Sequence, residues 1–85
     1  MYSVELSSRA ASELRACPPE LREELLTALE GLAASPRPAG CRKLSGRLAG
    51  TWRIRVRSYR ALYDIDDGRR SIHVVKIGPR KSVYR

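Results

Sequence analysis

Residue types that build specialised sites are scarce in this chain of 85 residues. Its two cysteines, Cys17 and Cys41, have no metal-ligand spacing and no companion cysteines, so we expect reduced thiols, no metal ion and a cytoplasmic protein. No apolar run is long enough to span a membrane and no signal peptide is recognisable, so no membrane is expected as a partner. The length predicts one domain, residues 1–85, with a single core, no buried ligand chamber and no cofactor.

Acidic residues are also few, and they are unevenly placed. Residues 1–40 hold four Arg and six Glu, a net charge of −2, whereas residues 41–85 hold thirteen Lys and Arg against three Asp, a net charge of +10. Such a difference in charge between the two halves predicts that the second half binds a polyanion. Arginine outnumbers lysine fourteen to three, which favours bidentate phosphate contacts.

Apolar and basic residues alternate strictly from Trp52 to Arg57, the period of a strand with one apolar and one cationic face. If Arg57-Ser58 is a two-residue hairpin turn, Arg55 lies opposite Arg60 and Arg53 opposite Leu62. Like charges directly opposite each other on a sheet repel. The pattern therefore predicts an anion site built on a sheet.

The first forty residues are expected to contain a short strand and a helical hairpin. Alternating apolar residues in 2–6 predict the strand, and Ser7 or Ser8 can cap the helix that follows. The two prolines at 18 and 19 end that helix, and Pro19 can also open the second helix as its first residue. The second helix has an apolar stripe of Leu21, Leu25, Ala28, Leu29 and Leu32.

Three strands are expected in the second half, over roughly 51–57, 59–66 and 70–77, after an irregular link over 43–50. A turn over 66–69 joins the last two strands, and its register places His73 beside Leu62. Gly78-Pro79 is expected to break the last strand. The order β-α-α-β-β-β predicts an α+β fold, in which a helical hairpin packs on one face of a small, mainly antiparallel sheet and the basic face stays open.

Four segments carry a resemblance to a known family: Lys43-Leu44-Ser45-Gly46, Gly50-Thr51-Trp52-Arg53-Ile54-Arg55, Tyr59-Arg60-Ala61-Leu62-Tyr63 and Ile77-Gly78-Pro79-Arg80-Lys81-Ser82-Val83-Tyr84-Arg85. They resemble the RelE toxins of bacterial type II toxin–antitoxin systems, within the RelE/ParE superfamily. The similarity covers nearly the whole chain. The pairing of Arg80 with Tyr84 is similar to the ribonuclease branch rather than to the gyrase-poisoning ParE branch.

The resemblance implies a ribosome-dependent endoribonuclease that cuts messenger RNA by attack of a ribose 2′-hydroxyl on the adjacent phosphate. That chemistry needs a base, positive charge around the phosphorane and a proton for the leaving 5′-oxygen. The resemblance also implies three partners: messenger RNA, the ribosome and a cognate acidic antitoxin. By position it implies catalytic roles for Arg55, Arg60, Arg80 and Tyr84, and RNA contacts for Lys43, Arg53 and Lys81.

The chain departs from the family pattern at two places. Arg53 and Arg55 stand where the best-studied members usually have lysine, and arginine stays protonated, so Arg55 is a poor general base. Tyr84 is then the candidate base in the motif, because a cluster of guanidinium groups favours the phenolate. The turn at Arg57-Ser58 also lacks the glycine that relatives often carry, although a tight primed turn needs a positive φ.

Two other functions stay open. A ParE-like inhibitor of DNA gyrase, without nuclease activity, would not need Tyr84. A non-catalytic RNA-binding module would need only the basic face, but such modules display aromatic rings among the basic residues, and here the strand aromatics are expected on the opposite face.

His73 is the only histidine, and a histidine in a sheet is more often a packing residue than a base. Residues 83–85 are expected to add little packing, as chain ends usually do.

Overall fold

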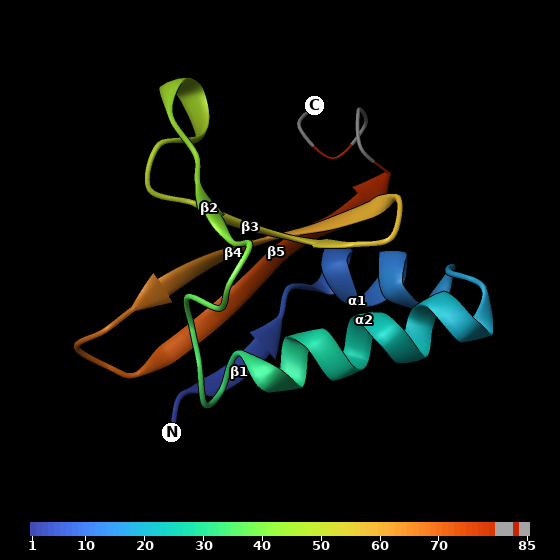
Figure 1. Ribbon diagram of the computed structural model, residues 1–85, viewed down its shortest axis with the longest axis horizontal. Coiled ribbons are helices and arrows are strands. Elements are labelled where there is room, and N and C mark those ends of the chain that lie inside the picture. Colours follow the sequence, from blue (N-terminus) through green and yellow to red (C-terminus); the bar gives the residue numbers. More distant parts are fainter. Residues whose placement is uncertain (80–82, 84–85) are drawn as a thin grey trace.

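A helical hairpin packs on one face of a five-stranded sheet (Figure 1). The structure is a computed structural model that describes residues 1–79 and 83. Its elements are β1 (Ser3–Leu6), α1 (Ser8–Arg15), α2 (Pro19–Gly31), β2 (Arg42–Lys43), the 3-10 helix η1 (Gly46–Leu48), β3 (Trp52–Val56), β4 (Tyr59–Asp66) and β5 (Ser71–Pro79). This arrangement confirms the predicted α+β fold.

The strand order in the sheet is β1-β5-β4-β3-β2, with β1 parallel to β5 and the other pairs antiparallel. Two predictions were wrong. No strand was expected between the second helix and residue 51, but β2 pairs there with β3, and the Leu44 N–H continues the ladder by donating to the Thr51 carbonyl at 2.8 Å. Gly78 does not break β5, since it pairs with Arg60, and Pro79 ends the strand, where a missing N–H is tolerated.

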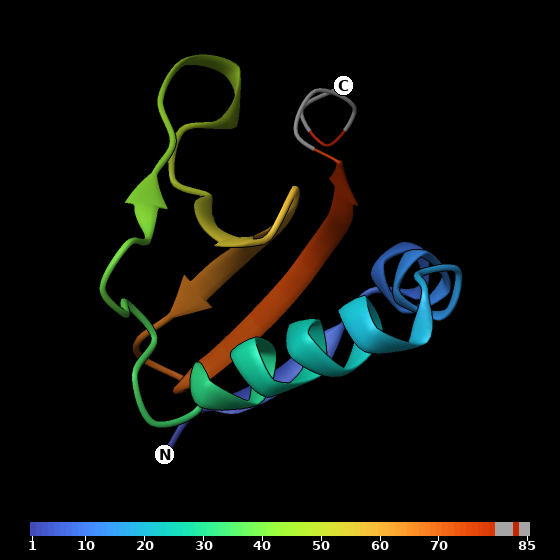
Figure 2. The same cartoon turned by 45° about the vertical axis from the view of Figure 1, so that its right-hand side comes forward.

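Both helices begin where the sequence predicts. The Ser7 hydroxyl caps α1 by accepting a hydrogen bond from the Ala10 N–H at 3.0 Å, and Pro19 is the first residue of α2. Figure 2, turned by 45°, shows both helices on the same side of the sheet and β2 at the edge far from α1. Within the described part of the chain, neither helix has the length and apolar content that a membrane crossing requires.

The core lies between the helices and the near face of the sheet. The leucine stripe of α2 is buried as predicted, and Ala28 packs against it half-buried. The fully buried Tyr63 donates its hydroxyl hydrogen to the Pro36 carbonyl at 2.8 Å, and burial raises the pKa of its phenol. The sheet supplies Ile54, Ala61, Tyr63, Ile72, Val74 and Ile77 to this core.

The β3–β4 hairpin has the predicted register, with Arg55 opposite Arg60 and Arg53 opposite Leu62. The turn is made without glycine, because Arg57 itself adopts a φ of 55°. Two hydrogen bonds of 2.6 and 2.8 Å join the Arg57 guanidinium to the Glu24 carboxylate of α2. The helix thus anchors the residue that holds the unfavourable backbone conformation.

The free edge of β5 is covered by α1 and by the residue before it. β1 pairs with β5 only over 71–74. Beyond that point the Ser7 hydroxyl donates to the Val75 carbonyl at 3.0 Å, and a Glu13 carboxylate oxygen accepts a hydrogen bond from the Ile77 N–H at 2.9 Å. Because Ile77 is buried, Glu13 satisfies a donor that water does not reach.

Loss of the Glu13 acceptor should destabilise the fold. We expect Glu13→Ala to lower the free energy of unfolding by about 1–3 kcal/mol, the cost of an unsatisfied buried donor. Glu13→Gln keeps an oxygen at the same place and should retain most of the stability. Urea unfolding followed by circular dichroism measures both variants; equal losses would show that the Ile77 hydrogen bond is not the cause.

Candidate functional site

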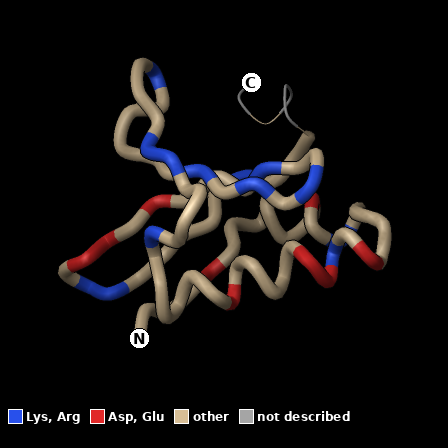
Figure 3. The backbone as a smooth tube through the Cα atoms, viewed as in Figure 1, with Lys and Arg blue, Asp and Glu red and all other residues tan. Residues whose placement is uncertain are grey.

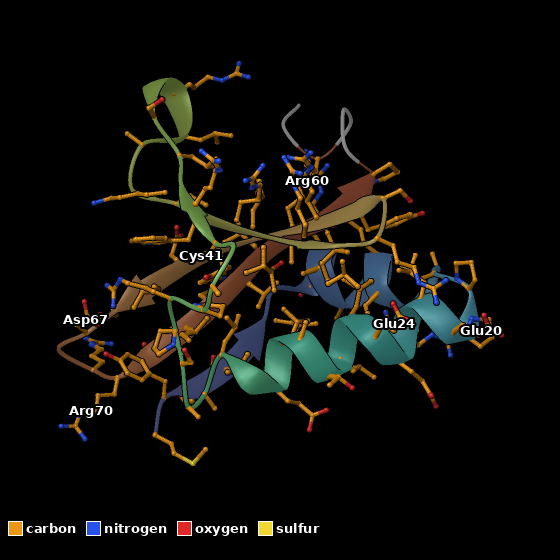
Figure 4. All side chains as sticks on the ribbon, in the orientation of Figure 1. Glu20, Glu24, Cys41, Arg60, Asp67 and Arg70 are labelled. Atoms are coloured by element: carbon orange, nitrogen blue, oxygen red, sulfur yellow. The ribbon has the colours of Figure 1, made fainter. Side chains whose placement is uncertain are left out.

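Strand alternation gathers arginines on the face of the sheet away from the helices. We call Arg42, Arg53, Arg55 and Arg60 the arginine face, because Arg42 pairs with Arg53 and Arg55 pairs with Arg60. Figure 3 shows the basic positions of β2, β3 and β4 along the sheet and the acidic positions of the helices below it. In Figure 4 the Arg60 side chain rises from the sheet on the side opposite α1 and α2.

The arginine face is less open than predicted. Arg42 and Arg55 are exposed, but Arg53 is only 6% and Arg60 only 7% exposed. Leu62, which shares this face by register, is also buried although it lies outside the core under the helices. Burial holds the two guanidinium groups in place, and pre-positioned charges interact more strongly with an anion than mobile ones do.

Arg53 has a buried donor that nothing satisfies. Its Nε–H finds no acceptor among residues 1–79 and 83. The three ion pairs within that part of the chain take Arg9, Arg37 and Arg57, so Arg53 also has no carboxylate partner there. A buried unsatisfied donor costs about 1–3 kcal/mol, which a bound anion would recover.

Arg42, rather than the predicted Lys43, lies beside Arg53. Neighbouring residues of a strand point to opposite faces, and Lys43 pairs with Trp52. The Lys43 ammonium lies 5.9 Å from the centroid of the Trp52 ring. The structure therefore does not bring Lys43 to the arginine face. The sequence reasoning missed Arg42 because it predicted no strand between the second helix and residue 51.

The segment that leads to β2 is held by a cluster around Asp67. Arg37 forms two hydrogen bonds with the Asp67 carboxylate, at 2.9 and 3.4 Å, and the Tyr2 hydroxyl donates to it at 2.6 Å. The Arg37 guanidinium also stacks over Trp52, 5.1 Å from its centroid. The bonds from Arg37 and then Tyr2 lower the pKa of Asp67. We call Tyr2, Arg37 and Asp67 the latch.

An acidic row borders the basic residues on the same face. Glu5 pairs with His73, and His73 pairs with Asp64. His73 was predicted beside Leu62, but a bulge between Leu62 and Tyr63 shifts the register, so Leu62 pairs with Lys76 instead. We call the carboxylates Asp64 and Glu5, with His73 between them, the acidic row; all three residues are exposed.

Lys76 is a second basic residue that sequence reasoning did not select. Burial, and then the nearby Arg9, lower the pKa of its ammonium, while Glu13 opposes them. Counting back two residues from Gly78 would have placed it on this face. Nowhere in 1–79 or at 83 do three or more His, Cys, Asp or Glu residues come together as metal ligands would.

The predicted site residues Arg80, Lys81 and Tyr84 lie outside the described residues. Val83 is described, and it is only 1% exposed. It lines a cavity of about 260 Å³ with Tyr59 and Pro79 at the end of β5. The expectation that residues 83–85 add little packing is therefore wrong at Val83.

Comparison with known proteins agrees with this fold and this face. The model of the family described as "ParE toxin of type II toxin-antitoxin system, parDE" matches residues 4–84. Toxin RelG of Mycobacterium tuberculosis (strain ATCC 25618 / H37Rv) is 31% identical over 85 residues, 99% of this chain and 97% of that protein. The chain belongs to the RelE/ParE superfamily of type II toxins.

Solved structures of RelE toxins share the fold of this chain. The toxin–antitoxin complex RelBE2 from Mycobacterium tuberculosis superposes with a TM-score of 0.83 at 28% identity, covering 93% of this chain and 98% of that one. The intact RelBE toxin–antitoxin complex of E. coli gives 0.80 at 30% identity, with 95% and 99% covered. The superfamily assignment made on the sequence motifs is thus confirmed.

Replacing Arg53 by an apolar residue of similar length should not destabilise this RelE-like domain. We expect Arg53→Met to keep or raise the free energy of unfolding, by up to about 2 kcal/mol, because the unsatisfied buried donor is removed. Ile54→Ala, on the other face of the same strand, should lose about 2–5 kcal/mol. Urea unfolding of both variants tests this, and a loss of similar size at Arg53 would mean that its guanidinium is structural.

The latch should make stability depend on pH. The pKa of Asp67 is lower in the folded protein than in the unfolded chain. The ionised carboxylate therefore stabilises the fold above the ordinary aspartate pKa, and this stabilisation is lost as the pH falls through the folded pKa. We expect Asp67→Asn to melt at a lower temperature than the parent at pH 7, and the difference to shrink as the pH falls below about 4. Melting curves between pH 7 and pH 3 measure it; a constant difference would contradict the latch.

Proposed function

We propose that this toxin is a ribosome-dependent endoribonuclease that cuts messenger RNA in the cytoplasm. The observation that supports it most is the pair of buried arginines, Arg53 and Arg60, on one face of the sheet, with the Nε–H of Arg53 unsatisfied. A phosphate can accept two parallel hydrogen bonds from a guanidinium group, and donors fixed in position can stabilise the charge of a transition state. The matched RelE structures favour the same activity.

The reaction would be attack of a ribose 2′-hydroxyl on the adjacent phosphate. Arg55 and Arg60 would stabilise the charge that develops on the phosphorane, and Arg53 would bind the phosphate. Arg80 would stabilise that charge or donate a hydrogen bond to the leaving 5′-oxygen, which would take its proton from water because arginine keeps its own. Tyr84 would accept the hydroxyl proton. Lys81 would contact the RNA, whereas Lys43 could do so only from the other face of the sheet.

The same charge distribution predicts the other partner. A surplus of positive charge on one face favours an acidic antitoxin, which would be partly disordered until it binds. The matched structures are complexes in which RelE-type toxins are bound by RelB antitoxins. We therefore propose a cognate acidic antitoxin for this chain as well.

A second function has one specific observation in its favour. The family model that matches residues 4–84 carries the ParE description. A ParE-like toxin would inhibit DNA gyrase and cut no RNA. The two functions differ in their need for proton transfer, and therefore in their need for Tyr84.

Removing one phenol should separate these functions. Tyr84→Phe should abolish cleavage, because no arginine can accept the 2′-hydroxyl proton. Tyr2→Phe removes a phenol from the latch, which contributes no residue to the arginine face, and this variant should cut normally. Primer extension on messenger RNA from ribosomes incubated with each purified variant measures cleavage.

Each result of this assay has a different consequence. If Tyr84→Phe cuts as well as the parent, another group supplies the base and the assigned mechanism is wrong. If the parent cuts no RNA but inhibits DNA supercoiling by gyrase, the ParE-like function replaces the proposed one.

A further inference from the structure

The arginine face continues toward one edge of the sheet. The exposed Arg42 of β2 lies directly opposite the buried Arg53 of β3, so the positive charge runs across the strands to the outer strand. Like-charged neighbours on adjacent strands destabilise a sheet. Neither arginine takes part in an ion pair within the described part of the chain, and a bound anion would compensate the repulsion between them.

A cavity opens at that same edge. It has a volume of about 850 Å³ and lies between α2, the segment over 38–42 and β3. Its lining includes three members of the arginine face, Arg42, Arg53 and Arg55, together with the small residues Ala28 and Ala39. We call it the edge cavity. Its size falls within the range of about 300–1,000 Å³ that ligand sites occupy.

Along β4, from Arg60 toward Asp64, the charge on this face of the sheet changes sign. The acidic row crosses β4, β5 and β1 at Asp64, His73 and Glu5. Asp64 is held there because its Oδ1 accepts a hydrogen bond from the Thr51 hydroxyl at 2.8 Å. A fixed carboxylate repels a phosphate at short range, so the acidic row disfavours a polyanion in this direction.

We propose that single-stranded RNA leaves the arginine face across β3 toward β2, with one backbone phosphate on Arg42 and the attached nucleotide over the edge cavity. The proposal rests on the proposed function, and it adds the direction of the strand and a contact residue. The Arg42 guanidinium can bind a phosphate with two parallel hydrogen bonds.

Matched single substitutions test the direction. Binding of a fluorescein-labelled single-stranded RNA is measured by anisotropy at several salt concentrations. For Arg42→Gln we expect the loss of one phosphate contact. This loss lowers the slope of the logarithm of affinity against the logarithm of salt concentration by about 0.7, and it lowers the affinity by about fivefold at 0.1 M salt. Arg69→Gln removes the same charge from the β4–β5 turn beyond the acidic row, and it should change affinity less than about twofold.

The acidic row has its own pair of variants. Asp64→Asn removes the charge but keeps an oxygen for the Thr51 hydroxyl, and it should tighten RNA binding. Glu23→Gln makes the same change on the exposed side of α2 and should leave binding unchanged. Equal effects within either matched pair would show that only net charge matters, and would overturn the proposed path.

Cleavage measured in parallel separates this proposal from the function it rests on. If the parent cuts messenger RNA on ribosomes while Arg42→Gln binds and cuts like the parent, the path is wrong and the function stands. If the parent neither binds the RNA nor cuts it, both are overturned.

Discussion

The rest of the structure depends on the pairing of β3 with β4, because this pairing decides which face of the sheet each arginine occupies. Opposing Arg55 and Arg60 costs about 0.2–1 kcal/mol, the scale of one cross-strand pair. Burying Ile54 and Tyr63 under the helices gains about 1.5–3 kcal/mol for each side chain. Hydrophobic burial therefore outweighs the repulsion, and a slip of one residue, which would turn the arginines into the core, is excluded.

Polar contacts at the margins keep this hairpin in place. Glu24 holds the turn through Arg57, Glu13 caps the free edge of β5, and Asp67 holds the segment before β2 through Arg37. Each of these contacts joins the helical half of the chain to the sheet half. The carboxylates of the described ion pairs are thus engaged away from Arg42 and Arg53, and these two arginines have no carboxylate partner within residues 1–79 and 83.

Arginine instead of lysine at positions 53 and 55 means that, in the proposed site, phosphate binding and proton transfer fall to different residues. Guanidinium groups can bind and stabilise a phosphate, but they cannot accept a proton at any pH at which the protein is folded. Phosphate binding is therefore assigned to the sheet, where Arg53 and Arg60 are buried and fixed in position. In the proposed function, proton transfer falls to Tyr84 in the C-terminal segment. A toxin that only binds its target would need no such group.

The sequence by itself determined the features that depend on neighbours in the chain. Alternation predicted the faces of β3, a two-residue turn predicted the register of Arg55 with Arg60, and Ser7 and Pro19 marked the helix starts. Only the tertiary structure decided the features that depend on distant residues. The bulge at Leu62 placed His73 beside Asp64. The pairing of β2 with β3 brought Arg42, rather than Lys43, to the arginine face. Burial left the Nε–H of Arg53 without an acceptor among the described residues. Local patterns fix which side a residue faces, whereas register shifts, edge pairing and burial follow from packing between segments far apart in the chain.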